Sequence, residues 1–220
     1  MSAVGSHIFY EITKRILDIL VSALGILVLS PVYVIITLLI KLDSEGPIIL
    51  RQLRQGKNGK YFIFYKFRSM VSDAEKKRGE VYPPARFEGP IFKIDGDSRI
   101  TRIGKSLRKF SLDELPQLFN ILKGDMSLVG PRPLVMIDVK NPKEPLLSEK
   151  DRIKYEIWKQ RRLEVKPGLT GMWQVNGRST LPLKGWVEND LYYVEHRSIW
   201  LDLEILFKTI PVALSGKGAV

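Results

Sequence analysis

The 220-residue sequence contains no cysteine and only two histidines, His7 and His196. The absence of cysteine excludes a disulfide framework, a thiolate nucleophile and any zinc site built on cysteine. Two histidines are too few for a multi-histidine metal site, and they make a serine–histidine triad a poor prospect. Thiolate and imidazole chemistry is therefore an unpromising basis for function in this chain.

Negative charge is also in short supply. The sequence has 35 Lys and Arg against 24 Asp and Glu, a formal net charge of +11. Within residues 1–40 the charges of Glu11, Lys14, Arg15 and Asp18 cancel, so residues 41–220 carry the whole excess. Nucleic acid, acidic lipid headgroups and phosphorylated small molecules are the expected partners, and charge alone does not choose among them.

A long apolar run lies near the start of the sequence. The 25 residues from Ile16 to Ile40 contain one charge, Asp18. A helix of this length, at about 1.5 Å per residue, can cross a hydrocarbon core of about 30 Å. Asp18 follows Lys14 and Arg15 at helical spacing, which predicts an ion pair with them at headgroup level. A cleavable signal peptide is disfavoured because the run is too long and is followed by charged residues.

Ser30 and Pro31 interrupt this run beyond its midpoint. Proline removes a backbone donor and crowds the preceding turn, so we expect a kink or break there. The residues allow either a bent helix that spans the membrane or a hairpin that enters one leaflet and returns, and physical reasoning alone favours the spanning helix.

The rest of the chain reads as helices around a little β-structure. Aromatic and β-branched residues on both sides of the Gly56–Gly59 turn predict a β-hairpin, with Lys66 and Arg68 on one strand face. Further helices are expected over Asp73–Glu80, Glu149–Val165, Asp190–Glu195 and Trp200–Leu214, the second of them with Ile153 and Ile157 on its apolar side, and a loop over Asn141–Pro145.

Two adjacent carboxylates, Asp113 and Glu114, stand at the predicted start of another helix. Ser111 and Glu114 have the spacing of a capping box, and Pro116 favours a start slightly later than Ser111. Acids in a first helical turn are common caps, but the positive end of the helix dipole also favours a phosphate beside them. Beyond this helix, Arg132 lies between two prolines, which reduces the entropy that it would lose on binding a phosphate.

Taken in order, these segments resemble the bacterial sugar transferases that act on polyprenyl phosphate, the monotopic phosphoglycosyl transferases, in their small, single-domain form. The likeness rests on the following segments: Lys14-Arg15 with Asp18, Ser30-Pro31, Lys66 to Met70, Leu112 to Leu118, Lys123 to Pro133, Pro167 to Gly171, and the C-terminal helices. Each is weak alone, but together and in this order they are specific.

The resemblance implies an α+β fold, mainly helical with a small β-hairpin or sheet. Residues 1–41 would be a tail and a re-entrant membrane helix broken at Ser30-Pro31. Residues 42–220 would be a catalytic domain with membrane-surface amphipathic helices, on the cytoplasmic face of the bacterial inner membrane.

The resemblance also implies a reaction. Asp113 would attack the sugar-linked phosphate of a nucleotide-sugar, a UDP-sugar, and release UMP. The covalent aspartyl intermediate would pass its sugar phosphate to polyprenyl (undecaprenyl) phosphate, the first membrane step of glycoconjugate assembly. Asp113 and Glu114 would coordinate Mg2+, a hard cation suited to oxygen ligands, and Glu114 would orient or activate.

Four cations match family positions near the dyad and are assigned to the substrate phosphates: Lys66, Arg68, Arg108 and Arg132. Arg178, in the Gly177-Arg178 turn, is assigned to the same role. The sequence departs from the common pattern at Asp97-Ser98-Arg99, where many relatives have proline in the middle, and at Ser69, where threonine is commoner. Met1 to His7 resembles nothing in the family. The sequence predicts neither the sugar nor the oligomeric state.

The competing interpretation is a non-catalytic, membrane-attached protein that binds nucleic acid or anionic lipid through its positive charge. It gives Asp113 no special role. No nucleic-acid motif and no Walker-type phosphate loop accompanies the basic residues, so we expect membrane lipid, but no nucleic acid, among the partners.

Overall fold

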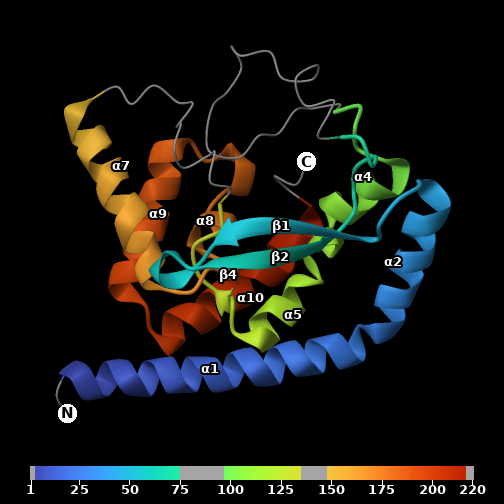
Figure 1. Ribbon diagram of the computed structural model, residues 1–220. Helices are drawn as coiled ribbons and strands as arrows, with labels where there is room; N and C mark the ends of the chain where they lie inside the picture. Colours follow the sequence, from blue (N-terminus) through green and yellow to red (C-terminus); the bar gives the residue numbers. More distant parts are fainter. Residues whose placement is uncertain (1–2, 75–96, 135–147, 217–220) are drawn as a thin grey trace.

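The computed structural model describes residues 3–74, 97–134 and 148–216 (Figure 1). These residues form a mainly helical α+β fold with two small β-pairs, which confirms the predicted fold class. In chain order the longer elements are α1 (Ala3–Val28), α2 (Ser30–Asp43), β1 (Ile49–Gln55), β2 (Tyr61–Phe67), α4 (Arg102–Lys109), α5 (Gln117–Lys123), β3 (Ser127–Val129), α7 (Glu149–Arg161), β4 (Gly168–Thr170), α8 (Met172–Val175), α9 (Leu183–His196) and α10 (Ile199–Ser215). Most of the predicted helix Asp73–Glu80 and the whole predicted loop Asn141–Pro145 lie outside the described residues.

The predicted hairpin is present. Strands β1 and β2 pair antiparallel from Ile49 opposite Phe67 to Gln55 opposite Tyr61. The turn between them is possible because Asn58 tolerates a positive φ, here 55°. Phe62 and Phe64, on one face of β2, are buried in the main core with residues of α5, β3, α9 and α10. This packing holds the end of β2, where Lys66 lies, next to α5.

A short parallel pair forms the centre of the molecule. Ser127 of β3 lies opposite Gly168 of β4, and Val129 lies opposite Thr170. The two backbones come so close that a Cβ atom added to Gly168 would lie 2.1 Å from the nitrogen of Gly130. Glycine is required at this approach, which explains the glycine that follows Pro167 at the start of β4.

The predicted helix from Glu149 ends at Arg161, where a turn of 3₁₀ helix, η3 (Arg162–Glu164), follows it. Its buried face is not the predicted one: Tyr155 and Trp158 are buried, whereas Ile153 and Ile157 are exposed. Large aromatic side chains fill the space against α9 better than the isoleucines would. The two C-terminal helices meet at Ser198 as predicted, but α9 already begins at Leu183, after Pro182.

Helices α1 and α2 form a bent pair at the predicted break. Among the described residues no single helix is both long and apolar enough to cross a membrane, but His7–Val28 and Ser30–Asp43 meet that condition together, with a bend of 60°. Pro31 cannot donate to the carbonyl of Leu27, and the Ser30 hydroxyl donates to that carbonyl instead, at 2.8 Å. The Ser-Pro pair thus bends the chain while satisfying the oxygen that the bend frees.

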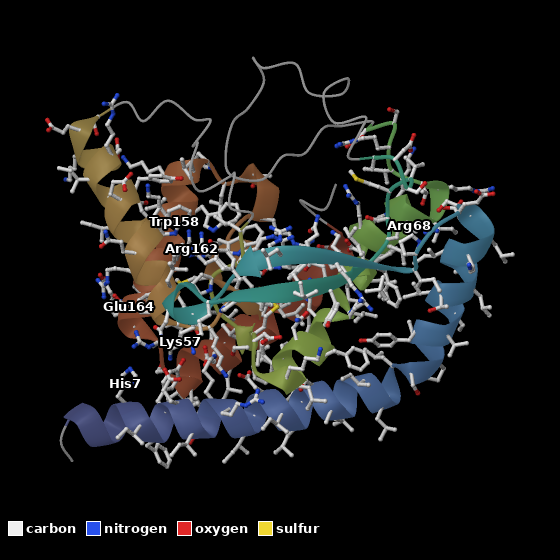
Figure 2. The ribbon with its side chains drawn as sticks, in the orientation of Figure 1. His7, Lys57, Arg68, Trp158, Arg162 and Glu164 are labelled. Carbon is white, nitrogen blue, oxygen red and sulfur yellow. The ribbon has the colours of Figure 1, made fainter. Side chains whose placement is uncertain are left out.

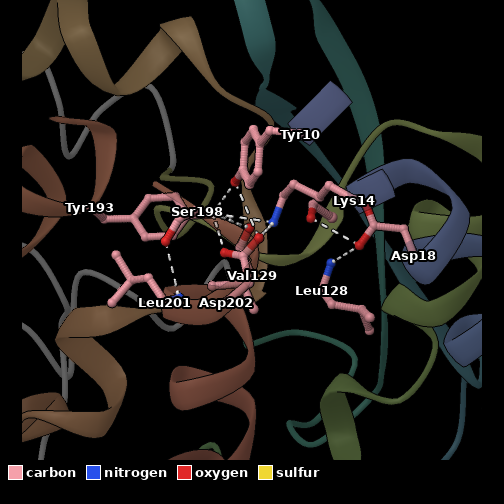
Figure 3. A network of polar contacts seen from close by, with 10 residues as sticks. Tyr10, Lys14, Asp18, Leu128, Val129, Tyr193, Ser198, Leu201 and Asp202 are labelled. Carbon is pink, nitrogen blue, oxygen red and sulfur yellow. Dashed lines mark hydrogen bonds and ion pairs between the residues drawn. The ribbon is translucent and has the colours of Figure 1, made fainter. Parts of the chain in front are cut away.

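Helix α1 lies along one side of the molecule (Figure 1) and is held there by buried polar contacts. Asp202 of α10 accepts hydrogen bonds from Tyr10 at 3.1 Å, Lys14 at 2.6 Å and Tyr193 at 2.8 Å. We call Tyr10, Lys14, Tyr193 and Asp202 the anchor network (Figure 3). It joins α1 to residues more than 170 positions later in the chain.

The predicted pairing of Asp18 with Lys14 and Arg15 is wrong. Asp18 is buried and accepts hydrogen bonds from the Leu128 amide at 2.9 Å and the Ser127 hydroxyl at 3.0 Å (Figure 3). Lys14 belongs to the anchor network, and Arg15 donates to the carbonyls of Ile121 and Leu122. Burial makes these distant donors better partners for Asp18 than a solvated neighbour on the same helix.

Candidate active site

The dyad Asp113–Glu114 lies in a turn of 3₁₀ helix, η2 (Leu112–Glu114), and not in the first turn of an α-helix. The predicted capping box is wrong, because Ser111 has a left-handed φ of 56° and its side chain caps nothing. Helix α5 begins only after Pro116, its N-cap, in agreement with the later start that this proline favoured. The dyad therefore occupies a tight turn packed against β2 and α4.

Asp113 is buried and pairs with Lys66, which comes from the end of β2. The Lys66 ammonium lies 2.9 Å from Oδ2 of Asp113. The other oxygen, Oδ1, makes no hydrogen bond with the described residues. A carboxylate with one oxygen fixed by a cation and the other not bonded within the described residues can act as a nucleophile or a metal ligand.

Glu114 pairs with Arg132, the arginine between two prolines. Nη2 of Arg132 lies 2.9 Å from Oε1 of Glu114, and Oε2 has no hydrogen bond within the described residues. Burial by itself raises the pKa of Glu114, but the charges of Arg132, Lys66 and Arg178 outweigh it and hold that pKa below its ordinary value. Glu114 is therefore ionised at neutral pH.

Arg178 is the third cation at the dyad, supplied by η4 (Arg178–Thr180). It is 9% exposed and donates to the Ser111 hydroxyl at 2.7 Å. Burial lowers the pKa of Arg178, while the nearby charges of Glu114 and Asp113 raise it. Lys66, Arg132 and Arg178 thus bring three cations from three segments to two acids. We call these five residues the dyad site.

The structure does not bring Arg68 to the dyad. Its guanidinium donates to the carbonyls of Pro47 and Ser44, both at 2.6 Å, beyond the end of α2. Figure 2 shows Arg68 beside α2, away from Arg162 at the opposite end of the hairpin. Arg108 donates through Nε to the Ser69 hydroxyl at 2.9 Å. The assignment of Arg68 and Arg108 to substrate phosphates stays a prediction that these contacts do not support.

The sequence did not predict a buried cluster, Trp158, Arg162 and Asp190, that contacts the backbone of Arg132. Arg162 donates to the backbone carbonyl of Arg132, and its guanidinium lies 4.5 Å from the centre of the Trp158 ring (Figure 2). Asp190 lies 3.9 Å from Arg162 and accepts from Trp158 at 2.8 Å. Burial raises the pKa of Asp190 to about 6, although Arg162 opposes this. The tryptophan-rich C-terminal half is the only sequence signal of this cation buried against an aromatic ring.

The described residues contain no group of three or more His, Asp or Glu side chains that could hold a metal ion. The dyad alone can contribute two carboxylates, each with one oxygen that is not bonded within the described residues. A magnesium ion typically binds one or two carboxylates together with substrate phosphates and water. The residues present fit such an ion when a phosphorylated substrate completes its coordination.

A model of the bacterial sugar transferase family matches residues 9–216 of the chain. The chain is 43% identical over 209 residues to the galactosyl transferase CpsE of Streptococcus agalactiae, covering 94% of this chain and 43% of that protein. It is 42% identical over 210 residues to the undecaprenyl-phosphate galactose phosphotransferase of Salmonella typhimurium, covering 94% and 41%. It is also 37% identical over 212 residues to the exopolysaccharide production protein ExoY of Sinorhizobium fredii, covering 94% and 88%. The chain thus spans less than half the length of the first two relatives and most of the third.

Proposed function

Because the chain belongs to the bacterial sugar transferase family, we propose that it transfers a sugar 1-phosphate from a UDP-sugar to undecaprenyl phosphate, releasing UMP. The observation that carries the proposal is the dyad site: two ionisable carboxylates, each with an oxygen not bonded within the described protein, lie among three cations. Phosphoryl transfer is catalysed mainly by positioning and by positive charge, which this arrangement supplies.

Asp113 is the proposed nucleophile. Its Oδ1 forms a bond to the phosphorus that carries the sugar, the bond from that phosphorus to the bridging oxygen breaks, and UMP leaves with the electron pair. A phosphate oxygen of undecaprenyl phosphate then attacks the same phosphorus, which breaks the bond to Asp113 and restores its carboxylate. The product is an undecaprenyl-diphosphate sugar, and no oxidant or further reactant is needed.

The remaining residues of the dyad site bind and orient. Lys66 fixes Oδ2 of Asp113 and so aims Oδ1. Arg132 holds Glu114 ionised, and Arg132 and Arg178 compensate the charge that builds on the phosphates. Asp113 and Glu114 would hold Mg2+ through their unused oxygens, and the ion would supply further positive charge to the phosphates.

Undecaprenyl phosphate is a lipid, so the proposal includes a place at the membrane. The outward faces of α1 and α2 carry large exposed apolar side chains without protein cover in the described residues, among them Phe9, Leu24, Leu27, Val34 and Leu42. With the 60° bend at Ser30-Pro31, they support a re-entrant pair that enters one leaflet and leaves both ends on the cytoplasmic face.

The chemical proposal is tested by UMP release. Purified protein with Mg2+, undecaprenyl phosphate and a panel of UDP-sugars should release UMP with one or a few donors. Asp113→Asn should lower this rate by about 10³-fold or more, since it removes the nucleophile. Asp151→Asn, a partly exposed acid on α7, is the matched control and should keep the wild-type rate. An undiminished rate in Asp113→Asn would exclude this nucleophile, and no release with any donor would favour a non-catalytic binding protein.

The topology is tested by labelling. The chain has no cysteine, so single cysteines at Gly5 and Glu45 can be labelled from either side of sealed vesicles. A re-entrant pair predicts that both sites are labelled from the same side. Labelling from opposite sides would establish a spanning helix instead.

A further inference from the structure

The segment Pro131-Arg132-Pro133 carries the arginine that pairs with Glu114. A proline ring fixes its own φ, and the residue before a proline is restricted to extended conformations. The two prolines stiffen the segment in this way, but they do not determine where it lies against the rest of the protein. Proline has no backbone N–H, so hydrogen bonds can hold this backbone only through the Arg132 amide and the three carbonyl oxygens.

Each of the three carbonyls accepts a hydrogen bond from a different segment: Pro131 from the Gly168 amide of β4 at 2.9 Å, Arg132 from the Arg162 side chain, and Pro133 from the Arg54 side chain of β1 at 3.2 Å. A hydrogen bond to a carbonyl constrains the plane of the peptide to which it belongs. The three contacts therefore orient the peptides that the prolines leave free. Arg162 binds the middle carbonyl, which belongs to Arg132 itself.

Arg162 is held in turn by two side chains. Its guanidinium lies 4.5 Å from the centre of the Trp158 ring (Figure 2), within the range of a cation–π contact. Asp190 lies 3.9 Å from Arg162 and accepts from Trp158 at 2.8 Å. Arg162 is only 6% exposed, and a buried charge is costly unless it is paired and hydrogen-bonded. A planar guanidinium packed against a ring also directs its donors along fixed lines.

The side chain of Arg132 packs against the same part of the core. Its guanidinium lies 5.7 Å from the centre of the Trp173 ring, and that ring stacks on Trp186 with 4.4 Å between the ring centres. Both tryptophans belong to the core cluster that contains Trp158. The C-terminal half therefore supports Arg132 at its backbone and at its guanidinium, and the guanidinium reaches Glu114 at 2.9 Å.

We propose that Arg162 is a positioning residue, which holds the backbone of Arg132 so that the Arg132 guanidinium meets Glu114 and the phosphates of the substrate. This inference rests on the proposed function and deepens it. It gives a cation buried in the core a role in the reaction, through a residue that touches the substrate. A cation placed before the substrate arrives needs little reorganisation when charge develops on the phosphates.

Four variants separate this role from a general contribution to stability. Arg162→Met removes the charge and the donor and keeps an unbranched side chain beside Trp158. Arg162→Lys keeps the charge and one possible hydrogen bond but loses the planar fork. Arg132→Ala removes the side chain that Arg162 would position. Arg197→Met is the matched control, because Arg197 also donates to a backbone carbonyl, that of Val194 near the end of α9, outside the dyad site.

The readouts are kcat and KM for UMP release and the unfolding temperature. We expect Arg162→Met to lower kcat by about 10- to 100-fold, the scale of a misplaced catalytic group. KM for the UDP-sugar should change less, because Arg132 acts mainly on charge that builds in the transition state. Arg162→Lys should lose less than Arg162→Met, and Arg197→Met should keep the wild-type kcat.

The double variant Arg162→Met/Arg132→Ala gives the deciding measurement. Once the Arg132 side chain is absent, a residue that acts by positioning it has nothing left to position. Adding Arg162→Met to Arg132→Ala should therefore lower kcat by less than about three-fold. A merely structural role predicts the same fold-loss in both backgrounds, in parallel with a lowered unfolding temperature.

Three results would overturn the inference: equal losses in the two backgrounds, a wild-type kcat in Arg162→Met, or an equal loss in Arg197→Met. If Arg162→Met does not fold, Arg162→Lys takes its place in both backgrounds under the same criteria. If the wild type releases UMP and Asp113→Asn does not, such a result removes only the role of Arg162. If the wild type releases no UMP, the proposed function and this inference fall together.

Discussion

The anchor network and the dyad site are both clusters of acids and cations in the interior, but they are built differently. In the anchor network, Asp202 has hydrogen bonds to both carboxylate oxygens, from Tyr10 and Lys14 at one and from Tyr193 at the other. In the dyad site, each acid uses one oxygen toward a cation and leaves the second unbonded within the described residues. The first cluster is satisfied without a ligand, and the second is not.

The backbone conformation also differs between the two clusters. The anchor residues lie in regular helices, α1, α9 and α10, whereas Asp113, Glu114 and Arg178 of the dyad site lie in 3₁₀ turns, and Arg178 has a positive φ. Unused hydrogen-bonding capacity and backbone strain both cost stability, and proteins retain them chiefly where a ligand or a reaction makes use of them. The anchor network therefore stabilises the fold, whereas the dyad site has the features of a site for a ligand or a reaction.

The stabilising role of the anchor network would be contradicted if removing one of its charges had no effect on the free energy of unfolding. Asp202→Asn leaves the largely buried Lys14 without its counter-charge, and we expect a loss of about 3–5 kcal/mol in the free energy of unfolding. The double variant Lys14→Met/Asp202→Asn removes both charges and should be more stable than Asp202→Asn alone. Chemical unfolding in detergent, followed by circular dichroism, measures both.

The matched control for this pair lies on the same helix. Lys208 and Glu204 form an exposed ion pair in α10 at 2.5 Å, and Lys208→Met/Glu204→Gln should change the free energy of unfolding by less than about 0.5 kcal/mol. Equal effects of the buried and exposed pairs would show that the anchor network does not hold α1.

A pH titration of stability tests Asp190, the acid of the buried cluster that contacts the backbone of Arg132. Burial raises the pKa of Asp190 to about 6, from an ordinary value near 4. Its neutral form is thus favoured in the folded protein, and stability is lost as pH rises from about 4 through 6. Asp190→Asn removes this loss, so the stability of the variant relative to the wild type should grow by about 2–3 kcal/mol between pH 4 and pH 7.

Asp97 gives a control of opposite sign. Its hydrogen bonds to Arg99 hold the pKa of Asp97 below its ordinary value, so its contribution is present at neutral pH and is lost as pH falls. Asp97→Asn should therefore be least stable relative to the wild type at neutral pH. If the stabilities of Asp97→Asn and Asp190→Asn, each relative to the wild type, changed in the same direction with pH, the raised pKa of Asp190 would be contradicted.

The sequence was sufficient for the features that depend on neighbours in the chain. Residue types on both sides of the Gly56–Gly59 turn located the hairpin, the sequence also located the C-terminal helices, and Pro31 located the bend. The dyad was found as a pair because its two acids are adjacent and match a family motif. What failed were the partners of polar side chains: the spacing of Asp18 predicted Lys14 and Arg15, and the spacing of Ser111 predicted a cap.

The physical reason is the same for both errors. Asp18 binds Ser127 and Leu128, and Ser111 binds Arg178, across large separations in the chain. In a buried site a distant partner that replaces lost water outweighs a local partner that stays solvated, and only the tertiary fold brings the distant partner near. Spacing along one helix therefore predicts polar contacts well at the surface and poorly in the interior.

The smallest expected effect is that of a variant that tests whether the bent helix pair, α1 and α2, influences the dyad site. The Tyr33 hydroxyl, on α2, donates at 2.6 Å to the carbonyl of Leu115, immediately after the dyad. Tyr33→Phe removes this hydrogen bond and keeps the ring packing against Phe67 and Phe119. We expect a loss of about 1 kcal/mol in stability and a few-fold fall in kcat, because the turn that carries Asp113 loses a support on its far side. Tyr65→Phe, which removes a hydroxyl from the exposed contact with Lys123, should leave kcat unchanged. If Tyr33→Phe lowers stability but not kcat, this hydrogen bond from α2 stabilises the fold and does not position the dyad turn.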